Sequence, residues 1–146
     1  MSGSSAYSPI SRRLLALGIA LFLLGLLTGL VTGALANPRM GVSAHLEGVL
    51  NGVFLIALSS AWRHIHLPKA AETTAFWLLA YGTTMNWAAT LAAAAWGTSG
   101  MTPIAGAGHQ GTAAHEMIIR VALLSLTAAM IVGVALLLWG VLAHRK

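Results

Sequence analysis

Four stretches of mostly apolar residues divide the chain. Each is close to the length of about 20 residues that a helix needs to cross the hydrocarbon core of a bilayer. The second stretch is the weakest, because it contains Glu47 and Asn51, and the third is rich in alanine with Asn86 near its middle. The pattern predicts an all-α membrane protein, a single domain over residues 1–146, in which four transmembrane helices form a bundle. The predicted spans are 14–35, 46–62, 74–96 and 118–142.

Composition supports the membrane interpretation. Of the 146 residues 58% are hydrophobic and only 8% are charged, whereas about a quarter of the residues in a soluble domain are charged. The acidic side chains are Glu47, Glu72 and Glu116 alone, too few for a carboxylate-rich metal centre. Because the chain has no cysteine, disulfides, thiolate zinc sites and iron–sulfur clusters are excluded as well.

The eight Lys and Arg residues stand at the ends of the apolar stretches, which is typical of a membrane protein and not of a nucleic-acid-binding protein. A four-span arrangement puts six of them on one side of the membrane and two on the other. Since the cytoplasmic side carries the excess of Lys and Arg, both termini are expected in the cytoplasm. The six are Arg12, Arg13, Arg63, Lys69, Arg145 and Lys146; the two are Arg39 and Arg120.

The first span also has the features of a secretory signal. Arg12 and Arg13 precede an apolar run, and Ala34-Leu35-Ala36 has the small residues of a cleavage site. The apolar run is longer than the usual 7–15 residues of a signal core. We therefore expect a retained transmembrane helix.

Polar residues inside spans are costly and are candidates for function. On a helix, Glu47 and Asn51 are four residues apart and share a face, whereas His45 points elsewhere. One site contains all three only if it lies between helices or between subunits. Gly48 and Gly52 follow His45 at helical spacing and would leave a flat strip for a planar macrocycle. Imidazole is a common axial ligand of haem iron, although hydrogen bonding at the membrane interface also explains His45.

The third span and the loop after it add further candidates. Asn86 and Thr90 are four residues apart and share a helix face, and two interpretations of Asn86 stay open: an interhelical hydrogen bond or a role in a pocket. Trp87 lies deep in the span and packs against either an aromatic substrate or a neighbouring helix. The nearly uncharged loop at 102–111, which includes His109, is a candidate re-entrant lid, but it lacks the lysine of a phosphate-binding loop.

Four motifs are distinctive: Asn37-Pro38-Arg39-Met40, the segment 43–52 (SAHLEGVLNG), the segment 86–90 (NWAAT) and the segment 102–111 (TPIAGAGHQG). Together they resemble the hydroxylaminobenzene mutase family, small integral-membrane enzymes of bacterial nitroarene degradation. The resemblance extends over nearly the whole chain. It implies a multi-pass isomerase of the bacterial inner membrane, surrounded by lipid, which rearranges aromatic hydroxylamines to 2-aminophenols.

A more distant similarity connects the chain to the styrene oxide isomerase family. That family forms trimers that bind haem b between protomers, with a histidine of the second helix as axial ligand. By this match His45 would ligate the iron and Asn51 would orient the substrate, so the resemblance implies a haem b-binding homotrimer. The family's active-site tyrosine falls at Thr90, a departure that weakens the case for an epoxide substrate. Glu47 is not part of that pattern and is the candidate proton shuttle. The shared pattern is Ala44-His45 followed by Leu50-Asn51-Gly52.

Other functions fit parts of the same pattern. The first alternative is the epoxide chemistry itself, in which a styrene-oxide-like substrate becomes an aldehyde. The second is a haem electron carrier, for which His109 or His115 would have to fold back as a second ligand, since no other histidine lies inside a span. The third is a small transporter or structural protein, in which Asn51 and Asn86 simply join helices.

Overall fold

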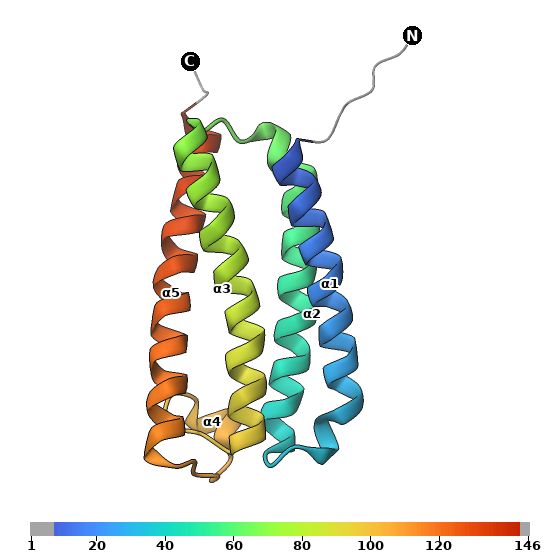
Figure 1. Cartoon of the computed structure of the whole chain (residues 1–146), viewed down its shortest axis with the longest axis vertical. Coiled ribbons are helices and arrows are strands. Elements are labelled where there is room, and N and C mark those ends of the chain that lie inside the picture. The colour runs from blue at the N-terminus through green and yellow to red at the C-terminus, as the bar shows by residue number, and fades with distance from the viewer. Residues whose placement is uncertain (1–7, 144–146) are drawn as a thin grey trace.

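The computed structural model describes residues 8–143, which form four long helices, one short helix and no strand (Figure 1). The long helices contain 23 to 30 residues, which corresponds to about 35–45 Å at 1.5 Å per residue. Each is long enough to cross a bilayer. They are α1 (Pro9–Val31), α2 (Pro38–Ala61), α3 (Lys69–Trp96) and α5 (Ala113–Leu142); α4 (Pro103–Gly106) is the short one, and single 3₁₀ turns follow α1 (Thr32–Ala34) and α2 (Trp62–His64).

The ends of the helices follow from capping residues. The side chain of Asn37 accepts a hydrogen bond from the Met40 amide at 3.1 Å, and Pro38 occupies the first turn of α2, where a missing N–H costs nothing. The hydroxyl of Thr112 caps α5 in the same way, accepting from the His115 amide at 3.2 Å. At the end of α3, Gly97 adopts a φ of 67°, the left-handed conformation that stops a helix.

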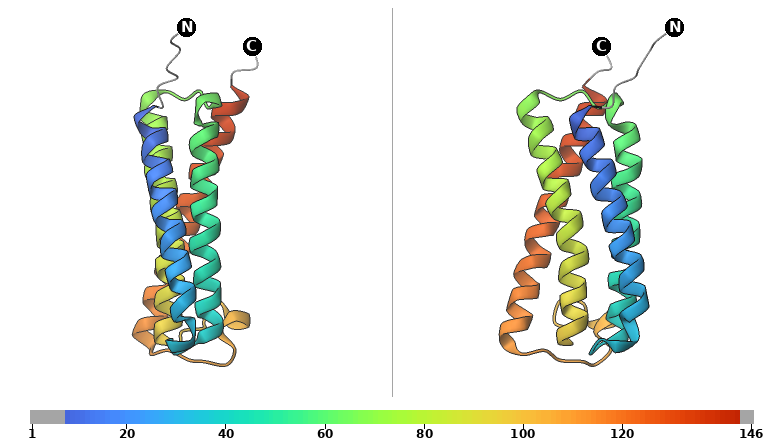
Figure 2. Two further views of the ribbon diagram at one scale, coloured as in Figure 1. Left: turned by 90° about the vertical axis from the view of Figure 1, so that its right-hand side faces the viewer. Right: turned by 45° about the vertical axis from the view of Figure 1, so that its right-hand side comes forward.

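The long helices pack as two pairs. α1 lies along α2, and α3 lies along α5, in every view (Figures 1 and 2). α2 also packs against α3 and joins the two pairs along one seam. α1 begins and α5 ends at the same end of the molecule, while α4 lies at the opposite end (Figure 1). Successive long helices therefore run in opposite directions.

Glycines make the contact within the first pair unusually close. A Cβ atom added to Gly25 of α1 would lie 2.7 Å from the carbonyl carbon of Gly48 in α2, and one added to Gly18 would lie 2.9 Å from the Gly52 oxygen. Because real Cβ atoms do not approach other atoms so closely, these positions need the absence of a side chain. Small residues that let backbones touch are the usual way in which membrane helices associate.

The all-α prediction is confirmed for the described residues. Three helices are long and apolar enough to cross a membrane: α1, α2 and α5. The sequence made the second stretch the weakest span, whereas by length and apolar character α2 qualifies as a span and α3 does not. α3 contains Lys69, Glu72 and several threonines as well as its apolar residues.

Three of the helices begin several residues before the predicted spans do. α2 begins at Pro38 and not at 46, α3 at Lys69 and not at 74, and α5 at Ala113 and not at 118, whereas α1 ends at Val31 and not at 35. The helices begin earlier because capping residues and prolines, not the edges of the apolar runs, determine where a helix begins. The prediction of cytoplasmic termini depended partly on Arg145 and Lys146, which lie outside the described residues.

Candidate functional site

A carboxylate and two carboxamides meet between α2 and α3. The side-chain amide of Asn51 donates a hydrogen bond to Oε2 of Glu47 at 3.3 Å, one turn away on the same helix. The side-chain amide of Asn86, on α3, donates to the same oxygen. All three side chains are half-buried. The sequence placed Glu47 and Asn51 on one helix face, and the structure adds Asn86 to them from the facing helix.

The arrangement in this cluster of Glu47, Asn51 and Asn86 is that of a held carboxylate. Both amide donors point to Oε2, and Oε1 of Glu47 has no hydrogen-bond donor among residues 8–143. A carboxylate oxygen that is free in this way can accept a proton or a hydrogen bond from a small molecule. The cluster can therefore act as a positioned acid or base.

Thr90 lies one turn beyond Asn86 on α3, as its spacing predicted. Its hydroxyl donates to the backbone carbonyl of Asn86 at 2.8 Å, a bond within the helix that threonine commonly forms. The hydroxyl proton of Thr90 is therefore used in a hydrogen bond within α3. Thr90 contacts the cluster at the backbone of Asn86.

His45 faces α1, away from the cluster, as the sequence indicated. Its Nδ1 lies 2.8 Å from the carbonyl oxygen of Gly25, and the ring lies over Gly29. Because a carbonyl oxygen only accepts hydrogen bonds, Nδ1 carries the proton and donates it. In the neutral form of such a ring the lone pair is on Nε2, the arrangement in which histidines bind metals.

The open strip expected at Gly48 and Gly52 is not present in the chain. Both glycines are buried against α1, with Gly48 against Gly25 and Gly52 against Phe22 and Gly18. The expectation was wrong on this point because two glycines on one helix face also permit a second helix to approach, and α1 does so here. A planar macrocycle does not lie flat on these two residues within one chain.

Trp87 packs between helices. Its indole N–H donates to the hydroxyl of Thr28 on α1 at 3.1 Å, and its ring lies against Gly48 of α2. The indole therefore links α3 to α1 and α2. This agrees with the interpretation that Trp87 packs against neighbouring helices. Thr28 and Gly25 were missed by the sequence analysis, since an apolar span gives no signal of which backbone or hydroxyl meets a partner.

The loop after α3 is fastened by two side chains. The carboxylate of Glu116 accepts hydrogen bonds from three backbone amides, those of Ser99 and Gly100 at 2.9 Å and that of Gly111 at 3.2 Å. The buried amide of Asn37 donates to the carbonyls of Ala105 and Gly106 at 3.1 and 3.0 Å. Glu116 and Asn37 therefore hold the loop against the helix ends.

Two further histidines, His109 and His115, lie at this same end. His109 approaches the Gly106 carbonyl with Nδ1 at 3.0 Å, and His115 stacks on Trp96 with 4.3 Å between ring centres. Within residues 8–143, no three His, Asp or Glu side chains come together as a metal site would require.

A small helical chain with apolar helices long enough to span a bilayer, and with a held carboxylate between two of them, is a membrane protein with a candidate acid–base site. The model of the styrene oxide isomerase family matches residues 10–142. The chain belongs to this family, and it is an isomerase.

Two relatives of the chain have the same named activity. The chain is 56% identical to hydroxylaminobenzene mutase HabB of Ectopseudomonas oleovorans over 93% of its own length and 84% of that protein. It is 44% identical to hydroxylaminobenzene mutase HabA of the same organism, over 88% of its own length and 96% of that protein. No solved structure matches the chain significantly.

Proposed function

We propose that the protein is a membrane-bound mutase that rearranges hydroxylaminobenzene and similar aromatic hydroxylamines to 2-aminophenols. The activity named for the two relatives supports this substrate class. The observation that carries the proposal is the half-buried Glu47 carboxylate, held by Asn51 and Asn86 in the seam between α2 and α3.

The rearrangement is an isomerisation, so no oxidant or reductant is consumed. The N–O bond breaks, a C–O bond forms at the ring carbon next to the nitrogen-bearing carbon, and the proton of that ring carbon is transferred to nitrogen. Because the product contains the same atoms as the substrate, the protein must orient the ring, exclude water from the electron-poor ring and move one proton.

The residues of the cluster suit these tasks. Glu47 takes the ring proton on its free Oε1 and returns a proton to nitrogen. Asn86 and Asn51 keep the carboxylate in place through Oε2, and the amide oxygen of Asn51 is the group that binds the substrate oxygen or nitrogen. Thr90 contributes by positioning Asn86, whose carbonyl its hydroxyl contacts. Apolar helices around the cluster keep water away from the ring.

Haem b is the proposed cofactor, and His45 is the residue that would hold it. The Nδ1–H donates to the Gly25 carbonyl, so Nε2 is the ring atom that would hold the iron. Since α1 covers Gly48 and Gly52, these two glycines would position His45 and α1 and would not touch the macrocycle. When bound, a ferric haem supplies Lewis-acid polarisation of the N–O group.

The proposed setting is the bacterial inner membrane, crossed by all four long helices, with both termini in the cytoplasm. The Lys and Arg residues of the described chain support this orientation, since Arg12, Arg13, Arg63 and Lys69 lie at one end and Arg39 and Arg120 at the other. The similarity to a trimeric family supports a homotrimer, in which the exposed apolar surfaces of neighbouring chains meet.

The mutase proposal is tested by assaying the purified protein with hydroxylaminobenzene and with styrene oxide in parallel. We expect 2-aminophenol from the first and little turnover of the second. Glu47→Gln should lower kcat at least ~100-fold, because general acid–base catalysis contributes 10²–10⁴-fold. Glu72→Gln is the matched control, since Gln keeps the acceptor for the Trp62 indole outside the cluster. Full activity of Glu47→Gln would overturn the assignment of the proton-transfer role.

The cofactor proposal has an optical test. Protein made with ample haem should show a Soret band that is lost in His45→Ala and kept in His109→Ala. His109 is a matched control because its Nδ1 also approaches a backbone carbonyl, that of Gly106. A band of unchanged intensity and position in His45→Ala would refute His45 as the ligand. Protein without any Soret band would refute haem as the cofactor.

The family model itself favours one other candidate function, the conversion of an epoxide to an aldehyde. In this reaction one C–O bond of the epoxide breaks and a hydride shifts to the adjacent carbon. The parallel assay distinguishes the two activities, because preferential turnover of styrene oxide would identify the chain as an epoxide isomerase.

A further inference from the structure

A long hollow runs along α3 on the side away from the Glu47 cluster. Between α1 and α3 lies a groove of 520 Å³ whose lining is almost entirely apolar and includes Leu17, Phe76 and Met85. A second hollow of 610 Å³ extends along α3 to Lys69. Trp77 and Tyr81 line both, so the two hollows adjoin each other.

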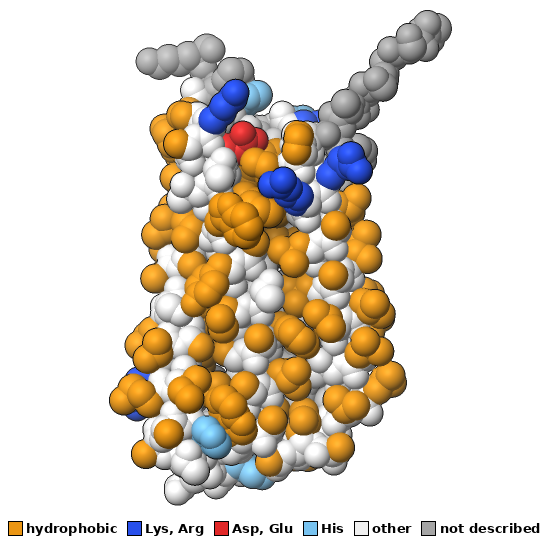
Figure 3. Space-filling model, in the orientation of Figure 1, with side chains coloured by type: hydrophobic (Ala, Val, Ile, Leu, Met, Phe, Trp, Pro, Cys, Tyr) orange, Lys and Arg blue, Asp and Glu red, His pale blue; other side chains and the backbone are white. Residues whose placement is uncertain are grey.

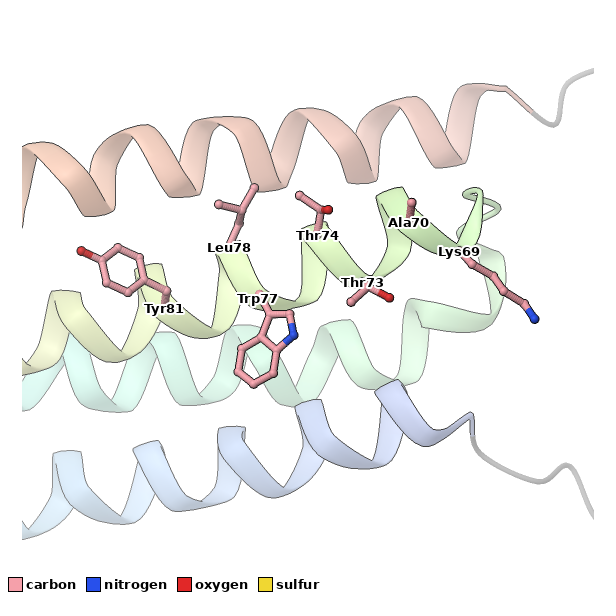
Figure 4. Close-up of a pocket in the computed structure, with 7 residues that line it drawn as sticks. All are labelled: Lys69, Ala70, Thr73, Thr74, Trp77, Leu78 and Tyr81. Atoms are coloured by element: carbon pink, nitrogen blue, oxygen red, sulfur yellow. The ribbon is translucent and has the colours of Figure 1, made fainter.

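Aromatic side chains shape this hollow. Trp77 is 62% exposed and extends from α3 towards α1, while Tyr81 lies one turn further along (Figure 4). The Tyr81 hydroxyl is hydrogen-bonded to Ser125 of α5 at 2.7 Å, which fixes one wall. The hollow lies open because α1 and α3 make few direct contacts, each being packed mainly on another helix.

Basic side chains border one end of the hollow. Lys69 stands at the start of α3 (Figure 4), and Arg12 and Arg13 line a shallow depression with Ala16, the residue before Leu17. All three cationic side chains are exposed. α1 and α3 begin at the same end of the molecule, and on the face shown in Figure 3 basic side chains gather at that end above a hydrophobic surface.

One acidic side chain, Glu72, lies at this end of the molecule with the three basic ones. The carboxylate of Glu72 accepts a hydrogen bond from the neutral Trp62 indole at 2.9 Å and keeps its own negative charge. The three cations at the rim therefore outnumber the single carboxylate. An occupant of this hollow needs an anionic group at the rim and an apolar chain along the groove.

We propose that the hollow between α1 and α3 binds an anionic phospholipid, with its phosphate between Lys69, Arg12 and Arg13 and one acyl chain along Trp77 and Phe76. This inference rests on the proposed placement of α1 and α3 across the membrane, not on the mutase chemistry. Basic pockets between membrane helices are known to bind anionic head groups on the cytoplasmic side, and that is the side proposed for this end.

Quenching of tryptophan fluorescence tests the site in the full-length protein. Brominated phosphatidylglycerol is titrated into detergent-purified protein, with brominated phosphatidylcholine as the neutral lipid. We expect phosphatidylglycerol to quench at a lower mole fraction, and Trp77→Phe to lose that high-affinity component. Trp139→Phe, which removes a tryptophan that is 50% exposed on α5, should keep it.

Charge variants test the rim. Each Lys or Arg contributes about fivefold to binding at an anionic surface, so Arg12→Gln/Arg13→Gln/Lys69→Gln should raise the half-quenching mole fraction roughly 100-fold. Lys69→Gln alone should raise it about fivefold, which gives a readout if the triple variant does not fold. Arg39→Gln/Arg120→Gln, at the opposite end, is the control and should bind as the unaltered protein does.

Three results would overturn the proposal. Equal quenching by the two lipids would mean that the groove takes any acyl chain. Equal losses in the Arg39/Arg120 control would mean that general surface charge attracts the lipid. Displacement of the brominated lipid by inorganic phosphate alone would mean an anion site without a role for the groove. Loss of mutase activity is not a readout in this test, so its outcome is independent of the proposed function.

Discussion

At the scale of single residues, Glu47 receives hydrogen bonds from two amides that differ in origin. Asn51 comes from the same helix, one turn away, whereas Asn86 comes from α3. Only the second bond joins two helices. The two asparagines therefore make similar contacts with the carboxylate but contribute differently to the stability of the fold.

This difference is measurable with Asn86→Ala and Asn51→Ala. Interhelical hydrogen bonds in membranes contribute about 0.6–2 kcal/mol, so Asn86→Ala should lower the free energy of unfolding by about 1 kcal/mol. Asn51→Ala should lower it by less than half as much, and both should reduce mutase activity because Glu47 loses a partner. Steric trapping or denaturation in mixed micelles gives the free energies, and equal losses in the two variants would contradict this account.

At the scale of helices, the α1–α2 contact depends on glycine. A Cβ at Gly48 would lie 2.9 Å from the Gly25 nitrogen and 2.9 Å from Cδ1 of Trp87, so the new methyl group meets backbone on one side and an indole on the other. The backbone of α1 has no room to move without loss of its contact at Gly52. The position therefore couples three helices.

We expect Gly48→Ala to destabilise the protein by about 1–3 kcal/mol, the usual cost of overpacking. Gly33→Ala is the matched control, because a Cβ there meets nothing within 4 Å. Thermal unfolding followed by circular dichroism should show a lower midpoint for Gly48→Ala alone. A midpoint unchanged from that of the unaltered protein would show that α1 and α2 adjust freely.

The sequence predicted the helices better than it predicted their neighbours. Apolar runs of sufficient length reveal spans, and spacing correctly separated the face of His45 from that of Glu47 and Asn51. Neither signal says which helix each face meets. The contact of Glu47 with Asn86, the covering of Gly48 and Gly52 by α1, and the use of Glu116 as a loop anchor all depend on tertiary packing, which periodicity does not encode.

At the scale of the whole molecule, α3 is the long helix without an apolar stretch that qualifies it as a membrane span, and it contributes Asn86, Thr90 and Trp87. Its polar side chains are partly covered by α2 and α5 against which it packs. A helix with partners on two sides exposes less of its surface to lipid, so it can cross a bilayer with a lower hydropathy than α1 or α5.

The crossing of α3 can be tested by cysteine labelling, because the chain has no cysteine of its own. Arg63→Cys lies before α3 and Met101→Cys lies after it, and both positions are exposed. An impermeant maleimide should label them from opposite sides of sealed vesicles. Gly33→Cys, at the same end of the molecule as Met101, should be labelled from the same side as Met101→Cys. Labelling of positions 63 and 101 from one side would refute the four-span proposal.

The two-pair packing has a consequence for how the chain is made. During synthesis α1 and α2 enter the bilayer first, so Glu47 arrives there with Asn51 beside it and before Asn86 has followed. Until the second hairpin docks, this carboxylate resides in lipid with one local donor. Burying it is unfavourable there, so the arrival of Asn86 releases free energy at the moment of assembly. The residue proposed for catalysis would thus also be the one that recruits the second half of the molecule to the first.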